Sequence, residues 1–253
     1  MERKIGLVLS GGGARGVAHL GVIKALEEMN IKPSIISGTS AGAIFGSLYA
    51  SGLSPDSILK IAQESEFFNI TDILFMKQGF FAMKSFEKVY KQTFPTDTFN
   101  DLQIPMYIAA TDIIKGEIHY FNTGTLSKAI MASSAIPIVF EPIHYINSVF
   151  VDGGVLNNFP IEPLIGKCDV IIGSHVNALN NENNQMSMKT ILDRSFHLAM
   201  SATVNTKFEQ CNVFIEPPMM TRFNIFDMKK YNEIFECGYN YTYTLKHKLE
   251  NLL

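Results

Sequence analysis

Ser40 stands in a sequence that could make it a nucleophile. It occupies the centre of GTSAG (Gly38 to Gly42), a G-x-S-x-G pattern that follows a short apolar run and precedes a helical one. A nucleophilic serine needs this context, because its hydroxyl must stand on a sharp strand-to-helix turn whose neighbours have almost no side chain. The helix start also adds a positive dipole end near a developing oxyanion. The pattern therefore predicts acyl-transfer chemistry at Ser40, with Gly38 and Gly42 leaving room for the turn.

A second glycine-rich loop lies closer to the N-terminus. Gly11, Gly13 and Gly16 fit G-x-G-x-x-G, the pattern of a dinucleotide-binding loop between a strand and a helix. That function requires an acidic residue about 20 residues further on. The only nearby acids, Glu27 and Glu28, lie in the intervening helix, and no Lys-Ser or Lys-Thr pair follows the glycines. The sequence therefore disfavours a nucleotide site.

The same loop has another interpretation. In a parallel sheet the loops after the first two strands open on the same edge, so Ser40 should face the backbone N–H groups of Gly11 to Gly13. These N–H groups could hold the oxyanion of an acyl-transfer intermediate, and glycine lets the backbone approach a substrate closely. We therefore expect both loops to belong to one hydrolytic site.

A serine nucleophile needs a proton acceptor, and histidine is the first candidate. The histidines are His19, His119, His144, His175, His197 and His247. His175 follows a predicted strand end and is the best of them. We interpret His19, His197 and His247 as structural, whereas His119 and His144 could lie on either face of extended segments.

Asp152 is the alternative base. It ends a predicted strand, and Gly153 and Gly154 after it let the backbone turn away while the carboxylate stays at the sheet edge. An exposed aspartate is a poor base at neutral pH, so its surroundings would have to limit its solvation or raise its pKa. A Ser–Asp dyad without histidine would then follow.

Apolar runs of strand length alternate with helical patterns and would position these residues. The predicted strands are Ile5–Ser10, Ser34–Ser37, Met106–Thr111, Val149–Val151 and Asp169–Gly173, with Glu117–Phe121 as one arm of a hairpin. The predicted helices are Val17–Glu28, Ala41–Ala50, one starting at Ser54-Pro55, Leu126–Ser133 and most of Asp227–Leu252. This alternation predicts an α/β fold with a mainly parallel sheet covered on both faces, in one domain over residues 1–253.

Composition excludes several classes of protein. The 253 residues are 47% hydrophobic and 18% charged, which suits a sizeable core and argues against disorder. A net charge of -3 gives no electrostatic footprint for nucleic acid. The three cysteines form no C-x-x-C pair, so we expect neither a disulfide framework nor a zinc site. No apolar stretch is long enough for a membrane span, and we expect a cytoplasmic protein.

Four sequence blocks together resemble the patatin-like phospholipase family. They are GGGARG (Gly11 to Gly16), GTSAG, DGG (Asp152 to Gly154) and ASSAIP (Ala132 to Pro137), and the resemblance covers roughly Ile5 to Ile165. It implies a three-layer α/β/α sandwich with a catalytic core over about 5–165, which residues 166–253 complete. The family's third block often ends D-G-A, and the D-G-G found here is a variant also seen in the family.

The resemblance also implies roles for single residues. Ser40 takes the nucleophile's place and Asp152 the base's, in a dyad that cleaves acyl esters of phospholipids or related lipids. Gly11, Gly12, Gly13 and Arg15 fall in the oxyanion loop, where the Arg15 charge could support the loop, attract an anionic head group or form a structural ion pair. No metal or organic cofactor is implied.

Apolar segments could receive the lipid. Ile73–Met83 is rich in Phe and Met and could form a flexible cap over the site or touch a membrane surface. After it, Phe86, Val89, Tyr90 and Phe94 form a helical stripe, most simply a core-facing one. A second candidate wall consists of Met219, Met220, Phe223 and Phe226.

Two other functions compete with lipid hydrolysis. A transacylase of related fold would also use G-x-S-x-G, but with a histidine as base, so His175 is the discriminating residue. A non-catalytic adaptor could keep the fold and bind a lipid or a protein. The intact pair of Ser40 and Asp152 favours the enzyme.

Overall fold

The computed structural model describes residues 3–64, 90–178, 191, 198, 204 and 206–252. Its described strands form one eight-stranded sheet: β1 (Ile5–Leu9), β2 (Ile35–Thr39), β3 (Met106–Asp112), β4 (Glu117–Phe121), β5 (Ile143–Tyr145), β6 (Ser148–Asp152), β7 (Val170–Ser174) and β8 (Val213–Ile215). The described helices longer than one turn are α1 (Val17–Glu28), α2 (Ala41–Ala50), α3 (Pro55–Glu64), α6 (Leu126–Ser134), α8 (Tyr231–Thr244) and α9 (Lys246–Glu250). The predicted helices Val17–Glu28 and Ala41–Ala50 coincide with α1 and α2.

The sheet is mixed, with a parallel centre. Its order is β5-β6-β3-β2-β1-β7-β8, with β4 paired to β3 outside this path. The pairs β3-β2, β2-β1, β1-β7 and β7-β8 are parallel, which confirms the predicted parallel core. β4, β6 and β5 form the antiparallel side, where β4 is the predicted hairpin arm.

A tight turn reverses the chain on the antiparallel side. Tyr145 pairs with Ser148 across Ile146 and Asn147, and both of these have positive φ, 46° and 56°. Two consecutive left-handed residues between paired strands are typical of the tight hairpin turn that matches strand twist. The turn leads into β6, which pairs antiparallel with β3. β6 therefore runs opposite to the central strands where it ends at Asp152.

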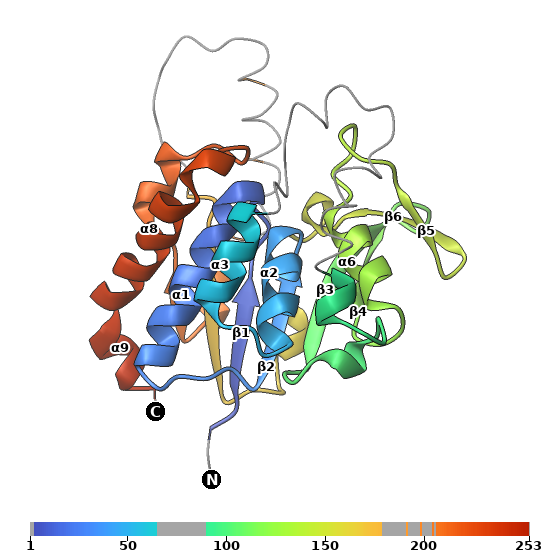
Figure 1. Cartoon of the computed structure of the whole chain (residues 1–253). Helices are drawn as coiled ribbons and strands as arrows, with labels where there is room; N and C mark the ends of the chain where they lie inside the picture. Colours follow the sequence, from blue (N-terminus) through green and yellow to red (C-terminus); the bar gives the residue numbers. More distant parts are fainter. Residues whose placement is uncertain are drawn as a thin grey trace.

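Helices lie on both sides of the sheet. α1, α2, α3, α6 and α8 share the main apolar core on one face, and Figure 1 shows α1, α2, α3 and α8 side by side in front of the strands. The opposite face buries a smaller cluster that includes Val8, Phe159, Ile161, Leu164 and Ile171. These layers agree with the predicted α/β/α sandwich.

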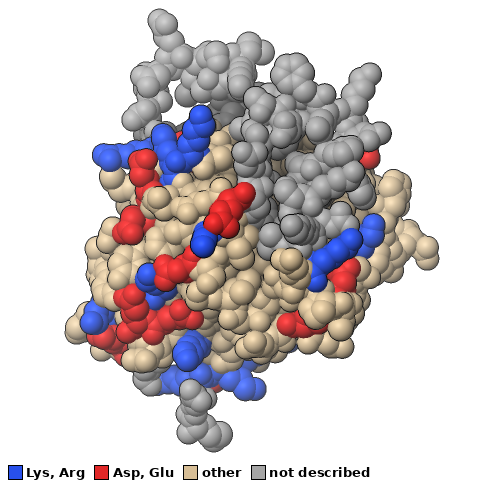
Figure 2. Space-filling model, viewed as in Figure 1, with Lys and Arg blue, Asp and Glu red and all other residues tan. Residues whose placement is uncertain are grey.

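The start of α3 lies where the sequence predicts it, and charged side chains lie on the surface. The Ser54 hydroxyl accepts a hydrogen bond from the Ser57 N–H at 3.3 Å, so α3 begins at the predicted cap. Lys24 of α1 forms an ion pair with Asp56 of α3 at 2.7 Å. Figure 2 shows basic and acidic side chains interspersed mainly on the left and lower parts of this face, while much of the remaining described surface carries neither. None of the described helices is both long and apolar enough to cross a membrane.

The turn from β2 into α2 depends on glycine. A Cβ added to Gly42 would lie 2.3 Å from the Leu9 carbonyl oxygen, so only glycine lets α2 pass this close to β1. A Cβ on Gly38 would lie 2.6 Å from the Gly42 backbone. The two glycines of G-x-S-x-G therefore let β1, β2 and α2 meet at Ser40.

Gly42→Ala should destabilise the fold strongly, because backbone cannot move aside as a flexible side chain can. We expect the free energy of unfolding to fall by about 3 kcal/mol or more, measured by denaturant titration. The matched control is Gly116→Asn, which should cost about 1 kcal/mol or less. Nothing lies within 4 Å of the Cβ position at Gly116, and asparagine tolerates its φ of +71°. Equal losses in the two variants would contradict the steric argument.

Candidate active site

Ser40 stands on a strained turn at the N-terminus of α2. Its φ of 52° and ψ of -119° are rare for a residue with a side chain. Such a conformation persists only where its surroundings enforce it, and it is the geometry of a nucleophile on a strand-to-helix turn. The sequence prediction of this turn agrees with the structure.

Ser133 braces the strained turn. The Ser40 N–H donates to the Ser133 hydroxyl at 2.8 Å, and that hydroxyl donates to the Ala109 carbonyl oxygen at 2.6 Å. Ser133 is completely buried. It belongs to the ASSAIP block, and this contact gives the block a physical role: it joins α6 and β3 to the turn that holds Ser40.

The strand register brings Asp152 level with Ser40. Thr39, the residue before Ser40, pairs with Ala109 of β3, and Asp152 pairs with Ala110. β3 lies between them, so the two backbones are two strand spacings apart, about 10 Å in total. The chain closes this gap after β6, because a Cβ on Gly153 would lie 2.3 Å from the Ala109 oxygen and 3.0 Å from Thr39 Cγ2.

The Asp152 carboxyl group is buried and hydrogen-bonded. It is 3% exposed, accepts the Gly154 N–H at 2.7 Å and accepts the Ser40 hydroxyl. Burial raises its pKa to about 6, although both hydrogen bonds favour the ionised form. Asp152 is therefore mostly ionised at neutral pH and basic enough to take a proton.

The first glycine loop lies across from Ser40, but not all its N–H groups are available. The point where a Cβ on Gly11 would lie is 3.1 Å from Ser40 Cβ. The Gly11 N–H donates to the Asn158 carbonyl oxygen at 3.2 Å, so it is already used. Within the described residues, no acceptor contacts the N–H of Gly12 or Gly13. Of the N–H groups of Gly11 to Gly13 that we expected to hold an oxyanion, those of Gly12 and Gly13 are therefore available.

Arg15 connects the first glycine loop to a segment near the C-terminal helices. It is buried, and its Nε–H donates to the Phe223 carbonyl oxygen at 2.8 Å. Of the three roles expected for its charge, this contact fits support of the loop, since it ties the loop to the segment after the short turn Pro218–Arg222.

His19 is structural, as expected from the sequence. Its Nδ1 and Nε2 contact the Ser174 hydroxyl and the Ser10 carbonyl oxygen at 2.7 and 2.8 Å. Complete burial lowers its pKa to about 4, so the ring is neutral near pH 7. A neutral ring that donates to Ser10 and accepts from Ser174 ties α1 to β1 and β7.

His175, the best histidine candidate, is paired elsewhere. Its Nδ1 lies 2.6 Å from Glu216 Oε1, and its ring stacks on Phe214. Its Nε2 is buried without a hydrogen-bond partner. The hydrogen bond of Ser40 goes to Asp152 rather than to this ring.

The remaining candidates are less central. His119 contacts the rings of Phe121 and Phe150, whereas His144 and His247 are exposed. His197 and the segment Ile73–Met83 lie outside the described residues. Of the second candidate wall, Met220 and Phe223 belong to the main core, and Met219 and Phe226 are partly exposed.

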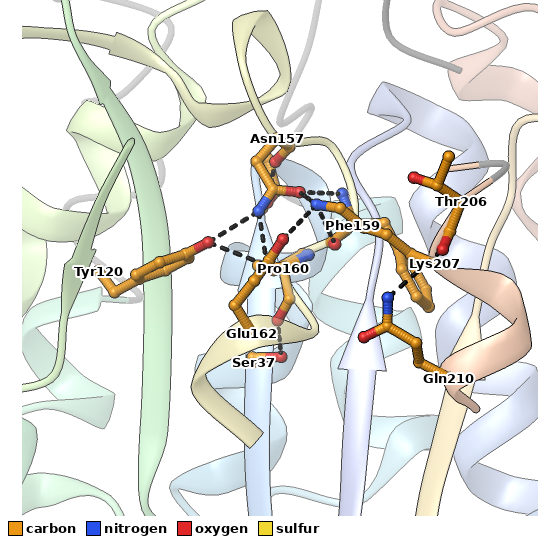
Figure 3. Close-up of polar contacts among 10 residues, drawn as sticks. Ser37, Tyr120, Asn157, Phe159, Pro160, Glu162, Thr206, Lys207 and Gln210 are labelled. Carbon is orange, nitrogen blue, oxygen red and sulfur yellow. Dashed lines mark hydrogen bonds and ion pairs between the residues drawn. The ribbon is translucent and has the colours of Figure 1, made fainter. Parts of the chain in front are cut away.

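A buried polar network supports the segment after Asp152 (Figure 3). Asn157 Nδ2 donates to the Tyr120 hydroxyl at 2.9 Å and to Glu162 Oε2 at 2.8 Å. Lys207 donates to Asn157 Oδ1 at 2.6 Å and pairs with Glu162 Oε1 at 2.5 Å. Burial alone would raise the pKa of Glu162, but the contacts with Lys207 outweigh it and hold the pKa below its usual range. The network fixes the irregular stretch between Asp152 and β7.

Sequence reasoning missed three residues at this site. Asn158 and Asn177 are both buried and contact Gly11: the Asn158 carbonyl accepts its N–H, and Asn177 Nδ2 donates to its carbonyl at 2.6 Å. Ser133 lies in the ASSAIP block, but the sequence gives this serine no separate role. The available signal was polarity, since asparagine is unusual in apolar stretches such as NNFPI and SHVNA.

The sequence of this chain is similar to those of known proteins. A family model described as patatin-like phospholipase matches residues 7–165. "Lysophospholipase nte1" of Aspergillus fumigatus is 26% identical over 98% of this chain and 18% of its own length. "Patatin-like phospholipase domain-containing protein ZK370.4" of Caenorhabditis elegans is 27% identical over 97% of this chain and 21% of its own length. The chain therefore spans about a fifth of these relatives.

A solved structure shares the fold. The crystal structure of VipD from Legionella pneumophila matches with a TM-score of 0.61 and 17% identity, over 98% of this chain and 67% of that chain. This likeness concerns the fold alone. The family model covers well over half of the sequence, from β1 to the end of the segment after Asp152. The chain therefore belongs to the patatin-like phospholipase family.

Proposed function

We propose that this protein is a serine lipid acyl hydrolase that uses Ser40 and Asp152. The observation that carries the proposal is the buried Asp152 carboxylate, which accepts the hydroxyl of a serine on a strained strand-to-helix turn. Buried carboxylates with raised pKa values beside a nucleophile are typical of catalytic sites. Membership of the family and relatives named lysophospholipases support the same chemistry.

Acylation starts when Ser40 Oγ attacks the ester carbonyl carbon and Asp152 takes the hydroxyl proton. The N–H groups of Gly12 and Gly13 and the N-terminus of α2 stabilise the oxyanion of the tetrahedral intermediate. As the intermediate collapses, the C–O bond breaks and Asp152 returns the proton to the leaving alcohol. The acyl group remains as an ester on Ser40.

Deacylation repeats these steps with water. Asp152 takes a proton from water, the resulting hydroxide attacks the acyl carbon, and the second intermediate releases a fatty acid and the Ser40 hydroxyl. The carboxylate thus acts as base in each attack and as acid in each collapse. A pKa near 6 suits both tasks close to neutral pH.

The substrate class we propose is phospholipids, lysophospholipids or simpler acyl esters. Because relatives of this chain are named lysophospholipases, a lysophospholipid is the first substrate to test. Transfer of the acyl group to a carrier is the competing outcome. It would share the acyl-enzyme but leave no free fatty acid, so product analysis separates the two reactions.

Ser40→Ala should abolish fatty-acid release from lysophosphatidylcholine, with a fall in kcat of at least about 10³-fold. Asp152→Asn should lower kcat by about 10⁴-fold, because the amide cannot take the proton. His175→Gln should retain kcat within about threefold, since Ser40 bonds Asp152 instead. Release is measured by mass spectrometry, and covalent labelling by a fluorophosphonate reports the nucleophile.

The matched control is Asp56→Asn, which removes a carboxylate from an exposed ion pair and should leave turnover unchanged. Full turnover in Asp152→Asn together with its loss in His175→Gln would refute the dyad. Labelling of Ser40 without any fatty-acid release would refute hydrolysis and favour acyl transfer.

The raised pKa of Asp152 predicts two pH effects. kcat/KM should fall about tenfold per pH unit below about pH 6, where the base is protonated. Stability should respond in the opposite sense, because ionising a buried acid destabilises the fold. The contribution of Asp152 to the free energy of unfolding is therefore complete below its ordinary pKa of 3.8 and is lost as pH rises through about 6.

Asp152→Asn should remove that penalty. We expect its melting temperature to exceed that of the wild type at pH 8 and to match it at pH 4, measured by differential scanning calorimetry. Asp56→Asn serves again as the control and should show no such gain. A variant that is less stable than the wild type at pH 8 would contradict the raised pKa.

A further inference from the structure

Asn158 presents polar atoms beside Ser40 that have no partner. It is completely buried, and among the described residues neither its side-chain oxygen nor its side-chain nitrogen has a hydrogen-bond partner. Buried polar groups are normally satisfied, so a carboxamide with both ends unpaired requires an explanation. The backbone of the segment that carries Asn158 is fixed by other contacts.

The carboxamide and the nucleophile lie around one point. A Cβ on Gly11 would be 2.4 Å from Asn158 Oδ1 and 3.1 Å from Ser40 Cβ. Glycine at this position thus leaves open the space between the carboxamide and the nucleophile. Neither end of the carboxamide is paired within the described residues, so a half-turn of the amide group costs no hydrogen bond and places Nδ2 where Oδ1 lies. In that orientation its N–H faces the space beside Ser40, where an oxygen of a bound ester would lie.

The backbone around Asn158 is held on every side. The Asn158 carbonyl accepts the Gly11 N–H at 3.2 Å, and the Asn157 carbonyl accepts the Thr39 hydroxyl at 3.0 Å. On the other side, the Phe159 N–H donates to Asn157 Oδ1 at 3.1 Å, and the Ser37 hydroxyl donates to the Pro160 carbonyl at 2.6 Å. Figure 3 shows the contacts of Asn157 with Phe159 and of Ser37 with Pro160. The backbone that carries the Asn158 side chain is therefore fixed.

We propose that the Asn158 side-chain amide is a catalytic hydrogen-bond donor to the ester oxygen, beside the N–H groups of Gly12 and Gly13. The role rests on the proposed acyl-hydrolase function. The Gly11 N–H is used by the Asn158 backbone, so the side-chain N–H of Asn158 takes the place of that missing donor. No covalent step is added: the amide only donates to the oxygen that gains negative charge when Ser40 attacks.

The test uses two variants of similar size that lack the donor. In Asn158→Leu and Asn158→Asp, kcat for a short soluble ester should fall about 10²- to 10³-fold while KM changes less than about threefold. The rate of Ser40 phosphonylation by a fluorophosphonate should fall in parallel, because the phosphonyl oxygen would occupy the same position. Asn158→Ala provides a second apolar variant if Asn158→Leu does not fold.

Thermal unfolding separates this role from a structural one. Asn158→Leu should keep or raise the melting temperature, since it removes unpaired buried polar atoms. The matched control is Asn240→Leu on the exposed side of α8, which should leave kcat unchanged. Retained kcat in the Asn158 variants, or a rise in KM alone, would overturn the proposal while leaving the acyl-hydrolase function intact. A wild type without Ser40-dependent turnover would overturn that function and this role together.

Discussion

The structure depends on burying one carboxylate beside one hydroxyl, with no cation among the described groups that shift its pKa. Asp152 loses nearly all its hydration, and only the Ser40 hydroxyl and the Gly154 N–H compensate for it. The balance leaves its pKa near 6 instead of 3.8. A stronger donor such as an arginine would have kept the carboxylate ionised and made it a poor base. Weak compensation thus gives an aspartate the basicity that histidine supplies in other serine enzymes.

The antiparallel side of the sheet makes this burial possible. The parallel strands β1 and β2 both end at the sheet edge where the Gly11 loop and Ser40 lie. β6 instead runs against β3, so its last residue lies level with Ala110, inside the sheet. The tight turn at Ile146 and Asn147 sets this direction. The chain then passes under β3, where Gly153 allows contact with Ala109 and Thr39.

Local patterns predicted much of this arrangement, but long-range contacts did not follow from them. Ser40 and its glycines were recognisable because the turn imposes steric demands on neighbours in sequence. The strand that carries Asp152 was also recognisable, whereas its antiparallel pairing was not, since Ile146-Asn147 lacks the Asn-Gly signal of a tight hairpin. The hydrogen bond from the Gly11 N–H to the Asn158 carbonyl could not be predicted either, because the two residues are distant in sequence and meet only in the folded protein.

Stability and catalysis make opposite demands on the polar groups at this edge. Ordinary folding pressure would pair every buried donor and acceptor, as it does at His19 and Asn157. Around Gly11 and Gly12 the pattern changes, because within the described residues the Asn158 side chain has no partner and the Asn177 side chain is paired only through its nitrogen. Unpaired polar groups are costly in the resting protein but need no reorganisation when charge develops on a substrate oxygen. Of the five buried side-chain atoms without a partner in the described part of the chain, three belong to Asn158 and Asn177. Their concentration beside one strained serine is what a preorganised reaction site would require.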